Sequence, residues 1–305
     1  MKLLTTNTGM KTRDSIWGLL FVAAPVLSVV LFVFLPALFS VYISMVEWNG
    51  YIPIGQAALV GFKNFALFLT HGGLYTKEFL NSFLVTLILM IFIPLSIIIS
   101  FLLAFILNKK ETYMNNALRL VYFLPFVSSA VAITLVFKNL FDMNGVVNSL
   151  FAFLGMEAAD WLRSPGLSRV VIIVMLIWRS IGYTMLMYLA GLQGIPNEIY
   201  EAAKIDGAGV LKIITKITLP SLKNITFFIV VTNVIGGLQI YTEPAILFQG
   251  TFGKGPLNGT ESMMIFLMYL YTGNNLGMAS AISWAITILV LLATFIQFAC
   301  KKNEG

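Results

Sequence analysis

Six long stretches without an acidic or basic residue, apart from one arginine, constrain the fold of this chain more than any other feature. They cover residues 15–46, 79–108, 120–137, 170–195, 224–242 and 262–300, and only the fourth is interrupted, by Arg179. A helix needs about 20 mostly apolar residues to cross a bilayer. Each stretch is close to that length or longer, and the last has room for an entry segment as well. The sequence therefore predicts an all-α membrane protein with six transmembrane helices.

The overall composition excludes several other classes of protein. Of 305 residues, 59% are apolar and 10% are charged, whereas a soluble domain carries about 25% charged residues. One cysteine and one histidine cannot build a disulfide framework or a Cys/His metal site. The net charge of +6 does not gather in a basic domain, so no nucleic-acid partner is expected. The apolar runs lack the alternation of membrane β-strands.

The distribution of lysine and arginine predicts the orientation in the membrane. Six spans place both termini on one side. With the N-terminus inside, the inner segments contain twelve basic residues and the outer segments six. Because inner loops are enriched in such residues, we expect both termini to be cytoplasmic. The longest loops have about 30 residues, so the chain has no soluble domain that could supply energy.

The inner loop 196–223 between the fourth and fifth stretches carries the most specific pattern. Asn197 is predicted to cap a short helix that ends at Gly207. The small and apolar residues of this helix share one face: Ile199, Ala202 and Ala203. From these features alone, the helix could either bind another protein or lie on the lipid surface.

This loop resembles the EAA loop of permeases from binding-protein-dependent ABC importers. The matching residues are EAA at 201–203, DGA at 206–208 and ITLP at 217–220. Leu211 and Ile214 depart from the usual tryptophan and aromatic residue but remain apolar. Segments outside the loop resemble carbohydrate permeases of the maltose and glycerol-phosphate type: 48–50, 60–65, 178–196, 255–260 and 277–281.

The resemblance implies a type I ABC importer permease in a bacterial cell (inner or plasma) membrane. It implies a cytoplasmic segment 1–15, a peripheral first helix with its outer loop over 16–78, a five-helix transport core over 79–300 and a cytoplasmic tail 301–305. It also implies a second homologous permease subunit, two ATP-binding subunits and an extracytoplasmic solute-binding protein. The residues implied to couple the chain to an ATPase are Glu201, Ala202, Ala203, Asp206, Gly207, Leu219 and Pro220.

No energy-converting chemistry is expected in the chain itself. It lacks a GxxxxGK[ST] loop, so ATP and magnesium would be used by the partner ATPase subunits. The chain itself is expected to bind no cofactor and to be a transport subunit, not an enzyme. A secondary transporter would need acidic residues within the spans, and an intramembrane enzyme a catalytic dyad or metal motif; neither is present. Only the resemblance of loop 196–223 to the EAA loop argues against a channel.

The predicted cargo is a sugar or oligosaccharide, which needs hydrogen-bonding groups and aromatic faces near the middle of the membrane. From the resemblance, the substrate-pathway candidates are Tyr183, Gly237 and Gln239, with Asn233 and Tyr241 beside them. Each could instead be a helix-packing residue. Arg179 within a span requires a partner or a wet cavity. It either binds an anionic substrate or pairs with Glu243 or with helix carbonyls.

Overall fold

The computed structural model describes residues 7–70, 72–108 and 113–302. For residues 7–16 and 113–116 it describes the backbone alone. Within this part, five helices are long and apolar enough to cross a membrane, and a sixth span results if a bent helix pair counts as one. The five are Trp17–Ser44, Leu74–Leu107, Pro165–Gln193, Lys223–Leu247 and Leu276–Lys302. They confirm the all-helical membrane fold. The predicted terminal segments 1–15 and 301–305 lie partly outside the described residues.

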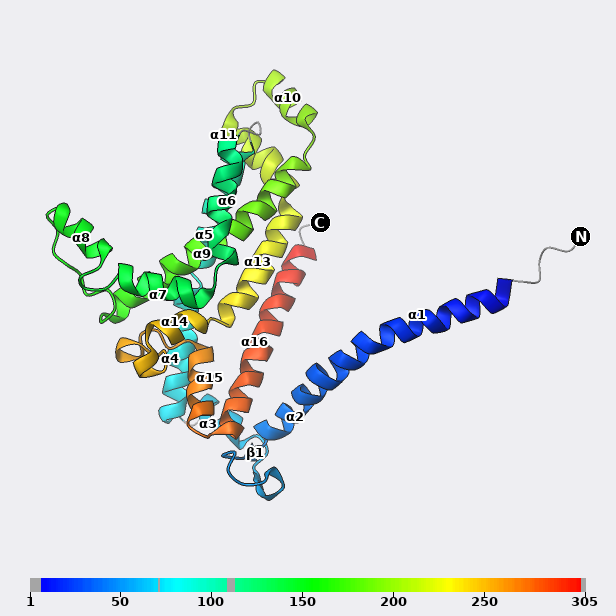
Figure 1. Cartoon of the computed structure of the whole chain (residues 1–305), viewed down its shortest axis with the longest axis vertical. Coiled ribbons are helices and arrows are strands. Elements are labelled where there is room, and N and C mark those ends of the chain that lie inside the picture. The colour runs from blue at the N-terminus through cyan, green and yellow to red at the C-terminus, as the bar shows by residue number, and fades with distance from the viewer. Residues whose placement is uncertain (1–6, 71, 109–112, 303–305) are drawn as a thin grey trace, which may run out of the picture. The chain divides into compact units, whose positions relative to one another are not determined.

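The stretch 120–137 does not form one straight helix, as a simple crossing would require. Helix α6 (Tyr113–Val127) and helix α7 (Ala130–Leu140) meet at an angle of 100°. Pro125 lies inside α6 and removes one backbone donor from it. Ser129, with φ −57° and ψ 127°, is extended and starts α7 in a new direction. Figure 1 shows α7 turning away from α6.

The described residues fall into two compact units. The first consists of residues up to 67 together with 270–284. Its helical part is an uninterrupted rod of α1 (Asn7–Val29), the π-helical turn η1 (Val30–Phe34) and α2 (Leu35–Ser44). No residue in the most apolar window of this rod is buried within the chain. Within its own unit, the rod therefore leaves its apolar surface uncovered.

A small turn structure follows the rod. Strand β1 (Val46–Glu47) pairs antiparallel with β2 (Ala58–Leu59), with the 3-10 turn η2 (Ile54–Gln56) between them and α3 (Lys63–Leu69) after them. The buried Asn64 amide donates to the carbonyl oxygens of Ser44, at 2.9 Å, and Val46, at 3.0 Å. This side chain ties the end of the rod to the start of α3.

The second unit contains the remaining residues. Besides α6 and α7, its elements are α4 (Leu74–Leu89), α5 (Phe92–Leu107), α8 (Val146–Phe153), α9 (Pro165–Gln193), α10 (Asn197–Ile205), α11 (Val210–Ile213), η3 (Ile214–Thr218), α12 (Leu219–Ser221), α13 (Lys223–Leu238), α14 (Thr242–Leu247), η4 (Gln249–Thr251), η5 (Pro256–Asn258), most of α15 (Met263–Thr272) and the last part of α16 (Leu276–Lys302).

Helix α9 forms the centre of this unit and packs along α5 and α6. One buried cluster joins α4, α5, α7 and α9 around residues such as Leu89 and Met175. A second joins α5, α9 and α13 around Tyr188 and Leu192. The hydroxyl of Ser100 donates to the carbonyl of Ile181 at 3.3 Å and links α5 to α9. This packing holds α9 in place, and the middle and the C-terminal end of α9 belong to the two sites described next.

Candidate functional site

The predicted helix of loop 196–223 exists as α10, but its cap differs from the prediction. Pro196 occupies the capping position, and Asn197 is the first helical residue and makes no capping bond. The prediction for Asn197 was wrong: Pro196, with φ −56° and ψ 135°, is the extended residue that precedes the helix. The predicted end at Gly207 is correct: this glycine has φ +73°, and the amide of Ala208 donates to the carbonyl of Ala203 at 2.9 Å. Such a left-handed turn closes a helix with glycine at little steric cost.

Helix α10 exposes a face that no described part of the chain covers. None of its residues is buried. Glu201, Ala202, Asp206 and Gly207 are exposed, and Ala203 is half-buried. Ile205 retains 86% of its surface, which is unusual for a large apolar side chain. Figure 1 shows α10 at the end of its unit, beyond α11.

The return from α10 to the membrane is a bent helical segment. The hydroxyl oxygens of Tyr200 and Thr218 lie 3.4 Å apart and connect α10 to η3. Leu219 and Pro220 stand exposed on α12. The structure thus brings Glu201, Ala202 and Ala203 together on α10, with Asp206 and Gly207 in the turn that ends it. It places Leu219 and Pro220 on a separate element, α12, just before α13.

A cavity of about 360 Å³ opens where α13 ends. Helix α13 stops at Leu238, and α14 begins only at Thr242. The intervening Gln239 and Tyr241 have non-helical backbones. Unwound backbone inside a membrane protein is tolerated where it lines a cavity, and interrupted helices commonly form transport sites.

Four of the six predicted substrate-pathway residues line this cavity, namely Arg179, Asn233, Gln239 and Tyr241. Tyr183 does not line it but stacks on Phe126, which does, with ring centroids 4.9 Å apart.

Gly237 lies away from the cavity and faces a neighbouring helix. It is buried, and a Cβ added to it would lie 2.9 Å from the Met90 side chain. Its neighbour Gly236 borders the cavity and has open space. Of these two neighbouring glycines, Gly237 therefore permits close helix packing, and Gly236 borders the cavity.

Further lining residues were not among the candidates: Phe92, Phe126, Leu176, Ser180, Gly236, Ile240, Thr242 and Glu243. No sequence pattern predicts that Phe126 lines the cavity, because it is the bend after α6 that brings this side chain to the cavity. Glu243 was recognisable only as a possible partner of Arg179.

Arg179 and Glu243 form an ion pair across the cavity wall. The Nη1 atom of Arg179 lies 2.6 Å from Oε1 of Glu243. The Glu243 side chain is 6% exposed and that of Arg179 is 35% exposed. Of the partners considered for Arg179, the structure shows the carboxylate. The pair joins α9 to α14 and leaves the two charges mutually balanced beside the cavity.

Comparison with known proteins identifies the family. A model of the family described as "Binding-protein-dependent transport system inner membrane component" matches residues 96–302. The chain belongs to this family. The family expected from the loop motif is therefore confirmed, and the chain is a membrane permease of a transport system rather than an enzyme.

Relatives and solved structures resemble the permease over nearly its whole length. It is 31% identical to the lactose transport system permease protein LacF of Rhizobium radiobacter, covering 98% of this chain and 99% of that one. It is 31% identical to the arabinooligosaccharides transport system permease protein AraP of Bacillus subtilis, covering 94% and 90%. In fold it resembles a chain of a bacterial ABC transporter that imports the acidic polysaccharide alginate, with a TM-score of 0.79, 21% identity and coverage of 96% and 98%.

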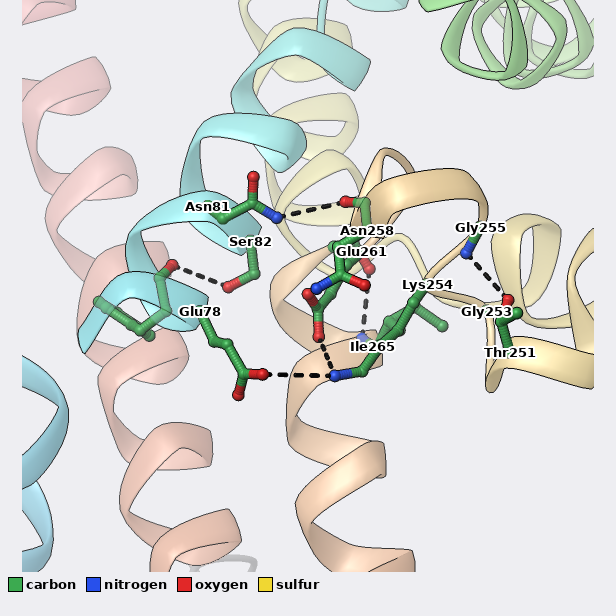
Figure 2. Close-up of polar contacts among 12 residues, drawn as sticks. Glu78, Asn81, Ser82, Thr251, Gly253, Lys254, Gly255, Asn258, Glu261 and Ile265 are labelled. Atoms are coloured by element: carbon green, nitrogen blue, oxygen red, sulfur yellow. Dashed lines mark hydrogen bonds and ion pairs between the residues drawn. The ribbon is translucent and has the colours of Figure 1, made fainter. Parts of the chain in front are cut away.

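The permease also contains a charge cluster, largely buried, that the sequence did not predict; it joins the segment after α14 to α4. The Nζ atom of Lys254 lies 3.0 Å from Oε1 of Glu261 and 3.8 Å from Oε1 of Glu78 on α4 (Figure 2). Asn81 donates to the carbonyl of Asn258 at 3.2 Å. Burial raises the pKa of the Glu261 carboxyl, while Lys254 acts in the opposite direction. These contacts attach the segment after α14 to helix α4.

Proposed function

We propose that this permease subunit moves a sugar or oligosaccharide inward by alternating access, driven by separate ATPase subunits. The exposed face of α10 carries the proposal, since its small residues permit the close approach of a partner surface. Its acidic residues give that contact a charge preference. Alternating access would follow when the partner moves α10 and the attached spans as rigid bodies.

The proposed assembly contains a second homologous permease, two ATP-binding subunits that use ATP and magnesium, and an extracytoplasmic solute-binding protein. One neighbour in fold was solved as an alginate transporter in complex with a periplasmic protein bound to an alginate pentasaccharide. We place both termini and loop 196–223 on the cytoplasmic side, from the distribution of basic residues. The five helices over 79–300 are the proposed transport core, and the first helix is peripheral.

The cargo is proposed to pass the cavity at the end of α13. Asn233, Gln239 and Ser180 offer hydrogen-bonding groups, and Tyr241 offers an aromatic ring. Such a combination suits a hydroxyl-rich solute. The names of LacF and AraP, which refer to lactose and arabinooligosaccharides, support a saccharide cargo. Because Glu243 balances Arg179, we propose a neutral saccharide rather than an acidic one. The cavity residues themselves are assigned no covalent chemistry.

The coupling role can be tested in the assembled complex. Replacing Glu201 with lysine should reverse the charge of the α10 surface, and replacing Gly207 with proline should destroy the helix end, because proline cannot adopt φ +73°. We expect loss of solute-stimulated ATPase activity or loss of the ATPase during copurification. Gly209→Ala is the matched control, since Gly209 has φ −68° and open space around it. Unchanged ATPase association and unchanged uptake in both variants would overturn the proposal.

A further inference from the structure

A second, larger cavity of about 610 Å³ lies between the start of α13 and the end of α16. Its lining residues come from α12, α13 and α16 and are largely apolar: Leu219, Pro220, Lys223, Thr226, Phe227, Val230, Ile296, Gln297, Cys300 and Lys301. Both helices are candidate membrane spans. The groove therefore opens at one end of the two spans. The ends of membrane-spanning helices lie at the polar region of the bilayer.

The polar residues of the groove gather at that end. Lys223 and Lys301 both line it, and Lys302 follows directly. The Nζ atom of Lys301 lies 4.3 Å from the centroid of the Phe227 ring, which holds the ammonium group over the groove. The opening is therefore basic, while Val230 and Ile296 make the rest of the wall apolar.

One buried acceptor in the groove lacks a partner. The Oε1 atom of Gln297 is shielded from solvent and receives no hydrogen bond from any described residue. Gln297 lies four residues before Lys301 on α16, so the two side chains occupy the same face of the helix. A buried amide oxygen without a donor is costly, and a ligand with a hydroxyl group could supply that donor.

We propose that this groove binds one anionic phospholipid. The phosphate would lie between Lys223 and Lys301, an acyl chain along Val230 and Ile296, and a headgroup hydroxyl within reach of Gln297. Basic pockets between membrane helices on the cytoplasmic side suit anionic headgroups. The apolar wall matches the acyl chain of such a lipid, and the basic opening at the helix end matches its anionic headgroup. The lipid would also touch Leu219 and Pro220, at the end of the loop assigned to coupling.

The single cysteine of the chain provides a built-in reporter of occupancy. Cys300 lines the groove and is exposed. The assembled complex would be placed in nanodiscs of phosphatidylcholine, with or without phosphatidylglycerol, and maleimide labelling of Cys300 would be followed by mass spectrometry of this chain. We expect phosphatidylglycerol to slow the labelling. Retained lipid would be counted by native mass spectrometry.

Two variants and one control define the outcome. Lys301→Gln should weaken lipid binding about fivefold, from a contribution of about 1 kcal/mol per basic residue near an anionic surface. Val230→Phe should block the acyl chain without changing the charge. Lys302→Gln removes the same charge from the adjacent position, which does not line the groove, and should retain the lipid.

Equal protection of Cys300 in both kinds of nanodisc would mean that the groove does not select an anionic lipid, because a protein subunit or phosphatidylcholine covers it in both. No protection in either would mean that the groove stays open. An equal loss of lipid in Lys301→Gln and Lys302→Gln would indicate attraction to the surface charge alone. Each of these results would overturn the proposal. None depends on transport, so the test is independent of the proposed cargo.

Discussion

Replacing Glu243 with glutamine would remove the partner of Arg179 while keeping the shape of the side chain. Breaking a fully buried ion pair costs about 3–5 kcal/mol, and an arginine at the centre of a span costs about 2.5–3.5 kcal/mol on insertion scales. The Arg179 side chain is 35% exposed, so water in the cavity reduces this loss. We expect Glu243→Gln to destabilise the permease by about 1–2 kcal/mol after that correction.

The matched control is the double variant Arg179→Gln with Glu243→Gln. Since removing both partners leaves no uncompensated charge, the double variant should be more stable than Glu243→Gln alone. Thermal unfolding of the purified complex would measure this difference. In proteoliposomes, Glu243→Gln should also lower the uptake of a neutral disaccharide and increase its inhibition by a disaccharide of uronic acids, because the cavity then carries an unbalanced positive charge.

Equal stability of the two variants, with a coupling energy below about 0.5 kcal/mol, would refute the reasoning about the ion pair. Uptake of acidic saccharides by the unmodified complex, with neutral ones excluded, would refute the proposed cargo while leaving the stability argument intact.

Other substitutions separate packing from transport. Gly207→Ala, which forces alanine into φ +73°, should destabilise the end of α10 by about 1–2 kcal/mol, whereas Gly209→Ala should not; ATPase stimulation by the solute distinguishes them. Gly237→Val should overpack against α5 and its preceding turn and cost about 1–3 kcal/mol in thermal stability. Gly236→Val should leave stability nearly unchanged but reduce uptake, because it narrows the cavity; equal stability losses in both would contradict this division. Burial raises the pKa of Glu261 above its unfolded value, so the folded state binds its proton more tightly and stability should fall as the pH rises above about 4.5. Glu261→Gln should flatten that dependence in unfolding curves, and an unchanged slope would exclude Glu261 as its source.

The chemistry of the linear sequence determined the class of this protein. Long uncharged runs admit only helices that bury their own backbone polar groups in lipid, so the spans follow from hydropathy alone. The positive φ at Gly207 was also predictable, since a glycine placed directly after a short amphipathic helix is a common helix end. The loop motif identified the family because its residues are consecutive and their spacing is local.

Only the tertiary structure decided which side chains meet. Hydropathy treats 120–137 as one run and carries no information on the 100° bend that brings Phe126 to the cavity. Gly236 and Gly237 are indistinguishable in sequence, yet one borders open space and the other packs against Met90. Lys254 lies far along the chain from Glu78, and Arg179 from Glu243. Such contacts depend on how separate helices pack, and no local pattern encodes that packing.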